Sequence, residues 1–270
     1  MLFLRWKSLQ RLVMGVVTFV CVLSFVACSA PQGNVSLLGE TSLRVATAPT
    51  FPPFSDVAPD GSIVGFDIDL MNAIAEVEGF DIELKSEPFF DDLIRDLYGG
   101  VVDAAVVAIT ITPERQKAVD FSQPYFQSSL AIAVQSTNDQ INSVNDLQDK
   151  RIGVEAGTTS ASAARTIRQA RVVSYDTAPI ALAELAQANV DAVINDAPAL
   201  TYAMQSGEVT GLKMLPEPLM EQYYGIAVAK GSPHLERINS GLETVVRNGR
   251  YAEIYRKWFQ TEPPRLPTEF

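Results

Sequence analysis

The sequence Val102-Asp103-Ala104-Ala105-Val106-Val107 returns in shorter form later in the chain, as Val190-Asp191-Ala192-Val193-Ile194. Each copy is a short apolar run of the kind that forms a buried strand, and each ends in a polar loop. A second pair of matching runs, Arg44–Thr47 and Arg151–Val154, opens the two halves of the chain. Because the same pattern occurs twice in the same order, the sequence predicts two similar α/β lobes.

Segments with strand-like composition alternate with segments of helical periodicity throughout the first half. In this half we expect strands at Leu43–Thr47, Ile82–Ser86 and Ala104–Val107, with helices at Phe66–Glu78 and Phe90–Leu97. Such alternation is typical of parallel sheets covered by helices. Each lobe is therefore predicted to hold a mainly parallel sheet flanked by helices.

Two further apolar runs, Ser129–Gln135 and Tyr223–Lys230, are long enough to carry the chain from one lobe to the other and back. If both runs are crossings, the first lobe comprises residues 43–126 plus 228–262, and the second lobe comprises residues 130–222. The chain is thus expected to have two lobes joined by two hinge crossings.

The C-terminal part of the chain is expected to end in a helix at Tyr251–Phe259 that packs on the first lobe. The aromatic side chains of Tyr255, Trp258 and Phe259 are expected to face the core. Pro263 and the prolines after it end regular structure, so residues 263–270 are predicted to be a C-terminal tail.

The N-terminal segment has the composition of an export signal. Arg5, Lys7 and Arg11 give a positively charged start, and an apolar run from Leu12 to Val26 follows them. The run is shorter than the roughly 18 residues expected of a membrane-spanning helix. We therefore expect residues 1–27 to be a cleaved signal peptide, with a retained membrane anchor as the alternative. Both interpretations place the rest of the chain outside the cytoplasmic membrane.

The segment Phe25-Val26-Ala27-Cys28 resembles the lipobox of bacterial lipoproteins, although Phe25 stands where leucine is usual. The resemblance implies that Cys28 carries a lipid. Residues 28–42, rich in small and polar side chains, then form a flexible tether. The protein is expected to be periplasmic or otherwise extracytoplasmic, and held at the membrane by its N-terminal lipid alone.

The charge and the rarity of histidine and cysteine exclude several classes of function. The chain has a formal net charge of −11, and loss of the three positive charges in residues 1–27 gives −11 − 3 = −14. Such a surface repels nucleic acid and anionic lipid. His234 is the only histidine, so neither a zinc site nor a serine triad is predicted. The sequence predicts a protein without metal or cofactor.

Six motifs stand in the order and at the spacing of a known family. They are Phe51–Phe54, Gly65–Leu70, Ile109–Arg115, Asp120–Tyr125, Gly157–Thr159 and Tyr251–Phe259. The chain resembles the extracellular solute-binding proteins of the polar amino-acid type, family 3, which serve ABC importers. The resemblance implies a two-lobed periplasmic-binding-protein type II fold, a free L-amino acid as ligand, an ABC permease as partner, and a monomer that works by lobe closure.

An amino acid is a zwitterion, so its receptor must offer donors to the carboxylate and acceptors to the ammonium group. Arg115 resembles the family's carboxylate clamp, and Thr110 with the backbone N–H after it resembles the second donor. Thr158 and Thr159 open a helix whose free N–H groups favour an anion, and Thr159 matches a family residue that binds the same carboxylate. A surface ion pair is the alternative role for Arg115, and a helix cap is that for Thr158.

Asp196 matches the family's acceptor for the ligand's α-ammonium group, with an N-cap of the following helix as its alternative role. Asp103 and Asp191 precede their strands at the end away from the cleft, so they are assigned structural roles.

Aromatic side chains are expected on both sides of the ligand. Phe51 and Phe90 match the family's two stacking positions, whereas Phe54, Phe66 and Phe89 are expected in the core.

The departures from the family pattern bear on specificity. Ala48 offers a methyl group where several relatives carry aspartate, and Ala108, where many have glycine, narrows the pocket. Glu155 stands at a variable position that faces the ligand side chain. An acidic residue there favours a cationic or amide side chain and repels glutamate or aspartate. A basic amino acid or glutamine is therefore the expected ligand.

Two other functions stay open. Cyclohexadienyl or arogenate dehydratases resemble these carriers, and Glu155 could act as a general acid if burial raised its pKa. The pairing of Arg115 with Asp196 instead favours capture of a zwitterion. A ligand-sensing receptor component is the other alternative, but such proteins need an output region, and none follows Trp258. We therefore expect a non-enzymatic carrier.

Overall fold

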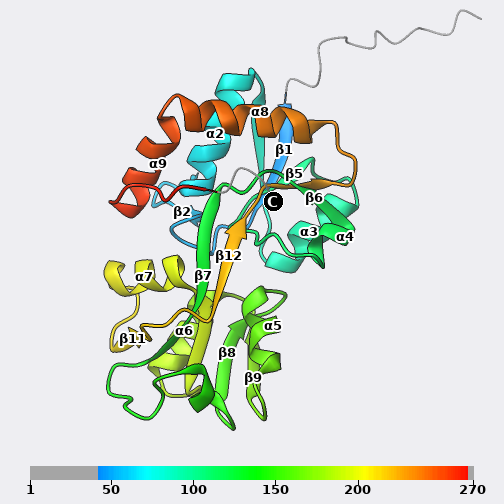
Figure 1. Ribbon diagram of the computed structural model, residues 1–270. Helices are drawn as coiled ribbons and strands as arrows, with labels where there is room; N and C mark the ends of the chain where they lie inside the picture. Colours follow the sequence, from blue (N-terminus) through cyan, green and yellow to red (C-terminus); the bar gives the residue numbers. More distant parts are fainter. Residues whose placement is uncertain (1–41, 267–270) are drawn as a thin grey trace, which may run out of the picture. The chain divides into compact units, whose positions relative to one another are not determined.

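The computed structural model describes residues 42–266 of the chain (Figure 1). The predicted signal peptide, Cys28 and nearly all of the predicted tether lie outside the described residues, as do residues 267–270 of the predicted tail. Within the described part of the chain, no helix is both long enough and apolar enough to span a membrane.

The first of two large sheets has three parallel strands on one side and two antiparallel pairings on the other. Its strands, in spatial order, are β4 (Asp81–Ser86), β1 (Ser42–Thr47), β5 (Ala104–Ala105), β13 (Ala227–Ala229) and β6 (Val119–Phe121). Strand β1 pairs in parallel with β4 and β5, and β13 runs antiparallel to both of its neighbours. A small hairpin, β2 (Asp56–Val57) and β3 (Ile63–Val64), stands apart from this sheet.

Helices cover both faces of the first sheet because alternate side chains of its strands are apolar. Leu43 and Val45 pack in the core cluster that holds α2 (Phe66–Glu78), α8 (His234–Arg247) and α9 (Arg250–Phe259). Ala46 packs in the opposite cluster with α3 (Phe90–Tyr98). The short helix α4 (Arg115–Ala118) precedes β6. Tyr255 is buried in the first cluster and Trp258 packs against it, so their predicted core-facing placement is confirmed.

The second sheet repeats this plan. Its strands, in spatial order, are β11 (Leu212–Met214), β7 (Phe126–Gln135), β10 (Ala192–Asp196), β8 (Arg151–Glu155) and β9 (Arg171–Tyr175), with β12 (Met220–Tyr224) paired to β7. Strands β10, β8 and β9 are parallel, and the partners of β7 are antiparallel to it.

Helices again lie on both faces of the second sheet. The core cluster on one face includes α5 (Thr159–Thr166), and the cluster on the other includes α6 (Ala178–Ala186) and α7 (Ala197–Ser206). A 3-10 helix, η1 (Val144–Leu147), precedes β8. Figure 1 shows the two sheets in separate lobes, with β7 and β12 leading from one toward the other. The predicted two-lobed α/β fold is confirmed.

Two details differ from the predictions. Ser129–Gln135, predicted as a crossing, lies within β7 and pairs with strands of the second sheet, so the chain passes between the sheets before it. Phe89 was expected in the core, and this is wrong because its side chain is 45% exposed. It stands just before α3, in extended conformation, while its neighbour Phe90 begins the helix.

The repeated arginine and aspartate hold equivalent strands together. Arg44 Nη2 lies 2.7 Å from Asp103 Oδ1, and Arg151 Nη2 lies 2.7 Å from Asp191 Oδ1. In each pair the other carboxylate oxygen accepts the arginine's own backbone N–H, at 2.9 and 2.7 Å respectively. The structural roles predicted for both aspartates are confirmed.

Candidate functional site

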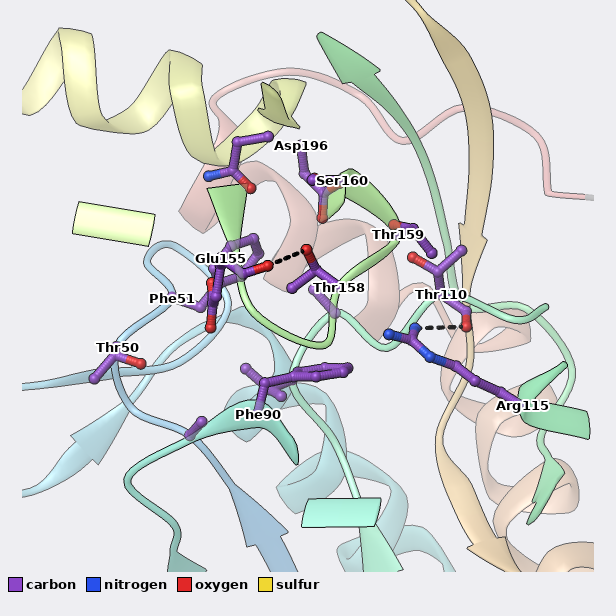
Figure 2. A pocket seen from close by; sticks show the side chains of 14 residues that line it. Thr50, Phe51, Phe90, Thr110, Arg115, Glu155, Thr158, Thr159, Ser160 and Asp196 are labelled. Atoms are coloured by element: carbon purple, nitrogen blue, oxygen red, sulfur yellow. Dashed lines mark hydrogen bonds between the residues drawn. The ribbon is translucent and has the colours of Figure 1, made fainter. Parts of the chain in front are cut away.

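A cavity lies where the carboxyl ends of strands from both lobes meet (Figure 2). The space between its lining atoms amounts to about 410 Å³, with open solvent included. All nine predicted ligand-binding residues line it, namely Phe51, Phe90, Ala108, Thr110, Arg115, Glu155, Thr158, Thr159 and Asp196. Their individual roles toward a ligand stay predictions.

Arg115 is fixed by the local backbone. It begins α4, and its N–H donates to Thr112 Oγ1 at 3.1 Å. Its Nη1 donates to the Thr110 carbonyl at 3.0 Å, and its guanidinium carbon lies 4.7 Å from the centre of the Phe90 ring. Burial lowers the pKa of Arg115 to about 10, partly offset by the charges of Asp196 and Asp91, so it stays protonated at neutral pH.

The guanidinium also contacts the second lobe, where its Nη2 donates to the Gly157 carbonyl at 3.3 Å. Gly157 has φ +73°, and a Cβ there would lie 1.8 Å from Asp91 Oδ1, which belongs to α3 of the first lobe. Only glycine fits this backbone conformation and this close approach. Both known partners of the Arg115 side chain are carbonyls, so the alternative of a direct surface ion pair is not observed among residues 42–266.

The two threonines that follow β8 have different hydrogen-bond partners. Thr158 caps α5: its Oγ1 accepts the Ala161 N–H at 3.2 Å and donates to the Glu155 carbonyl at 2.8 Å. The predicted cap is thus confirmed, and the Thr158 hydroxyl proton is already used by the Glu155 carbonyl. Thr159, the first residue of α5, accepts a hydrogen bond from Gln222 Nε2 at 2.8 Å.

Asp196 ends β10 with one carboxylate oxygen satisfied and one unsatisfied. Its Oδ2 accepts from the Tyr224 hydroxyl at 2.8 Å, whereas its buried Oδ1 has no hydrogen-bond partner among the described residues. Asp196 occupies the N-cap position of α7, as its alternative role predicts, but its side chain makes no capping hydrogen bond to that described helix. Burial raises the pKa of Asp196 to about 6, against the lowering effects of Tyr224 and Arg115. A buried acceptor in this state suits an ammonium group.

Glu155 ends β8 and is 8% exposed. Burial raises its pKa to about 8, the charges of Asp196 and Asp91 add to this effect, and a hydrogen bond from the Ala178 backbone opposes it. Figure 2 shows Glu155 and Arg115 on opposite sides of the pocket, with the Phe90 ring below. The cavity therefore has a cation at one side and a titratable carboxyl group at the other.

Ala108 has a backbone conformation that favours glycine, with φ +47°. Its N–H donates to the buried carboxylate of Asp67 at 2.7 Å, and this bond holds the turn that lines the cavity. Phe51 forms a bridge with Ser55 and stacks on the core residue Phe54, with ring centroids 6.0 Å apart. Phe54 is fully buried as predicted, and so is Phe66.

One predicted donor is wrong. The N–H after Thr110, that of Ile111, donates to the Tyr223 carbonyl at 2.8 Å. The reason is that Thr110 forms an antiparallel bridge with Tyr224, a pairing between distant segments that the local motif does not reveal. The Thr110 hydroxyl donates to Gln222 Oε1 at 3.0 Å.

Sequence reasoning missed several residues at the site. Thr50, Ser160 and Asn195 line the cavity. Asn195 is buried, and its Nδ2 has no partner within the described residues. Its position beside Asp196 at the end of a predicted strand was a usable signal. Gln222 contacts two lining residues but belongs to no motif.

Within residues 42–266, no group of three or more His, Cys, Asp or Glu side chains is arranged to hold a metal ion.

Comparison with known proteins gives consistent matches. The family model of "Bacterial extracellular solute-binding proteins, family 3" matches residues 43–261. A probable histidine-binding protein of Neisseria gonorrhoeae is 32% identical over 225 residues, covering 81% of this chain and 83% of that protein. The ABC transporter glutamine-binding protein GlnH of Bacillus subtilis is 34% identical over 208 residues, covering 75% of both chains.

A solved structure agrees with these matches. An ancestral arginine-binding protein bound to arginine is 41% identical and superposes with a TM-score of 0.78, covering 82% of this chain and 99% of the other.

Proposed function

Because the chain belongs to the bacterial extracellular solute-binding proteins, family 3, we propose that it is the substrate-binding component of an ABC importer for polar amino acids. A single observation carries the proposal: a half-buried cation, Arg115, and a buried carboxylate with an unsatisfied oxygen, Asp196, face one cavity from different lobes. This pairing complements the two charged groups that all free α-amino acids share.

The ligand's α-carboxylate is assigned to Arg115 and to Thr159 at the start of α5. A guanidinium can hold a carboxylate by two parallel hydrogen bonds, and the free N–H groups of a helix N-terminus favour an anion. The α-ammonium group is assigned to Asp196 Oδ1, which lacks a partner among the described residues. Both lobes then grip the ligand's backbone.

The side chain of the ligand is assigned to the end of the cavity near Glu155 and Asn195, between Phe51 and Phe90. A carboxylate beside an amide favours a cationic or amide side chain over an acidic one. The names of the histidine-, glutamine- and arginine-binding relatives support the same class of ligand side chain. A basic amino acid or glutamine is thus the favoured ligand.

Capture proceeds by closure of the first lobe, residues 43–126 plus 228–262, on the second, residues 130–222. The membership of the strands in two sheets supports this division. The two connections between the sheets act as a hinge, and the closed form is the one presented to the permease. Residues 1–27 serve as signal peptide, Cys28 carries the lipid, and residues 28–42 tether a monomer to the membrane.

A second candidate is dehydration of prephenate or arogenate, favoured by one observation. The raised pKa of Glu155, about 8, leaves it protonated at neutral pH, as a general acid requires. The acceptor Asp196 weighs against prephenate, because that substrate has no amino group for it to bind. Binding without catalysis is therefore the preferred proposal.

Isothermal titration calorimetry tests these two functions against each other. The full chain, purified in mild detergent, is unfolded and refolded to remove retained ligand. It is then titrated with the common amino acids, ornithine, citrulline, prephenate and arogenate. We expect one-to-one binding of a basic amino acid or glutamine, lost in Arg115→Met and kept in Asp139→Ala, a change at an exposed site away from the cavity. Turnover of prephenate or arogenate without binding of any amino acid would overturn the proposal.

A further inference from the structure

Gln222 connects the two lobes directly behind the cavity. It lies in β12, its side chain is 3% exposed, and its amide contacts one threonine from each lobe. Its Nε2 donates to Thr159 Oγ1 at 2.8 Å, and its Oε1 accepts from Thr110 Oγ1 at 3.0 Å. Both threonines line the cavity beside Arg115.

The chemistry of an amide determines what the two hydroxyl groups can still do. A side-chain amide has a donor end and an acceptor end, whereas a threonine hydroxyl has one proton and two lone pairs. Thr110 gives its proton to Gln222, while Thr159 receives one and keeps its own. If the amide is rotated by half a turn, the two threonines exchange roles. In either orientation, one hydroxyl proton is used by Gln222 and the other is available to a ligand.

We propose that Gln222 is a positioning residue for the carboxylate clamp. Its Nε2–H occupies a lone pair of Thr159, and this directs the Thr159 proton toward the ligand's α-carboxylate beside Arg115. The same amide also accepts from Thr110 of the first lobe, so contacts from both lobes fix which end of the amide faces Thr159. This inference rests on the proposed function, since it needs a ligand with a carboxylate.

The neutral charge of Gln222 matters as much as its shape. A glutamate of nearly the same size would offer two acceptors and no donor, so both hydroxyl protons would turn toward it and away from the ligand. It would also place a negative charge behind the clamp, in a buried position where repulsion of the ligand's carboxylate is weakly screened. An amide is therefore the group that this position requires.

The test is a double-mutant cycle measured by calorimetry on the full chain with the amino acid that binds the wild type. Loss of an oriented hydrogen bond to a charged group weakens binding roughly tenfold to a hundredfold, which we expect for Gln222→Glu. The additional cost of Gln222→Glu should be much smaller in a Thr159→Val background, because no hydroxyl remains to be oriented. A merely structural role would give the same cost in both backgrounds.

Two further variants guard against effects of folding. Gln222→Met removes both hydrogen bonds without burying a charge, and should weaken binding about threefold to tenfold. Gln135→Glu makes the same chemical change at the half-buried end of β7, where the amide donates to the Ala186 carbonyl, and should leave affinity unchanged. Thermal unfolding, followed by circular dichroism, establishes that each variant is folded.

The outcomes separate this inference from the proposed function. Wild-type affinity in both Gln222 variants, or equal losses with and without Thr159, would overturn the inference while the carrier function stands. Absence of amino acid binding in the wild type would overturn the function, and the inference with it.

Discussion

The two lobes share one frame, which consists of the paired strands and the Arg–Asp ion pairs at the amino ends of their sheets. At the carboxyl ends of the sheets the two lobes carry different side chains. At the amino ends, Arg44 with Asp103 and Arg151 with Asp191 make matching side-chain and backbone contacts. The strands that carry them pair in the same register, Val45 beside Ala104 in one lobe and Ile152 beside Ala192 in the other. The repeated residues thus specify the frame.

The carboxyl ends of the same strands differ. Ala48 lies four residues after the first arginine, and Glu155 lies four residues after the second. Ala108 lies five residues after the first aspartate, and Asp196 five residues after the second. The first lobe has methyl groups where the second has carboxylates, and it contributes the cation from Arg115 on a separate helix. One frame can therefore present complementary charges to a zwitterion.

The largest effect is expected when Asp196 is replaced by alanine, the residue that stands at the equivalent position of the first lobe as Ala108. Asp196→Ala removes the acceptor for the ammonium group and leaves that charge buried without a partner, which costs about 2–5 kcal/mol of binding free energy. Affinity for the amino acid, measured by calorimetry, should fall at least thirtyfold. An affinity within threefold of the wild type would show that the ammonium group binds elsewhere.

The pH dependence of stability should also distinguish the two equivalent positions Ala48 and Glu155, because Ala48 cannot titrate and Glu155 can. Burial raises the pKa of Glu155 from 4.5 to about 8, so the folded protein holds this proton more tightly than the unfolded chain. The resulting stability is fully present below about pH 4.5 and is lost as the pH rises through about 8.

Comparison with Glu155→Gln isolates this contribution. Between about pH 6 and pH 9, the free energy of unfolding of the ligand-free wild type should fall by roughly 2–3 kcal/mol more than that of the variant. Urea denaturation across this range gives both values. Parallel curves for the two proteins would contradict the raised pKa.

The preference for a charged ligand side chain should weaken when Glu155 is replaced by alanine, the residue at the equivalent position Ala48. In Glu155→Ala the loss of a buried acceptor for a charged side chain, worth about 1.5–3 kcal/mol, should weaken arginine binding. Citrulline has nearly the same shape but no charge, so its affinity should change less. Calorimetry with both ligands gives the ratio of their affinities. An unchanged ratio would exclude Glu155 as a determinant of specificity.

The smallest effects are expected at the shared amino ends. The arginines of both ion pairs are more than 40% exposed, so solvent limits each pair to about 1 kcal/mol. Asp103→Asn and Asp191→Asn should therefore lower the free energy of unfolding in urea by similar, modest amounts. Neither should change ligand affinity, and a tenfold loss in either variant would show that the frame and the site are coupled.

Local patterns in the sequence account for most of the fold and for the lining of the site. The helix Phe66–Glu78 has the predicted ends because Gly65 and Gly79, both with positive φ, flank it. The site residues were found because their motifs stand at strand ends and helix starts, where the α/β plan brings polar groups together.

Features that depend on long-range pairing could not be predicted. The Ile111 N–H was expected to be free, but the bridge between Thr110 and Tyr224 uses it. Gln222 reaches both lobes only because β12 pairs with β7 at the point where the chain passes between the sheets. Neither contact leaves a period or a motif in the sequence, since each joins segments about a hundred residues apart.

One amino acid is assigned a place between a cation of the first lobe, Arg115, and a carboxylate of the second, Asp196. A crystal structure of the chain with its tightest-binding amino acid tests this most directly. We predict the α-carboxylate on Arg115 and Thr159, the α-ammonium group on Asp196, and the side chain toward Glu155. A ligand in the reverse orientation, or one bound outside this cavity, would contradict this assignment of the ligand's groups.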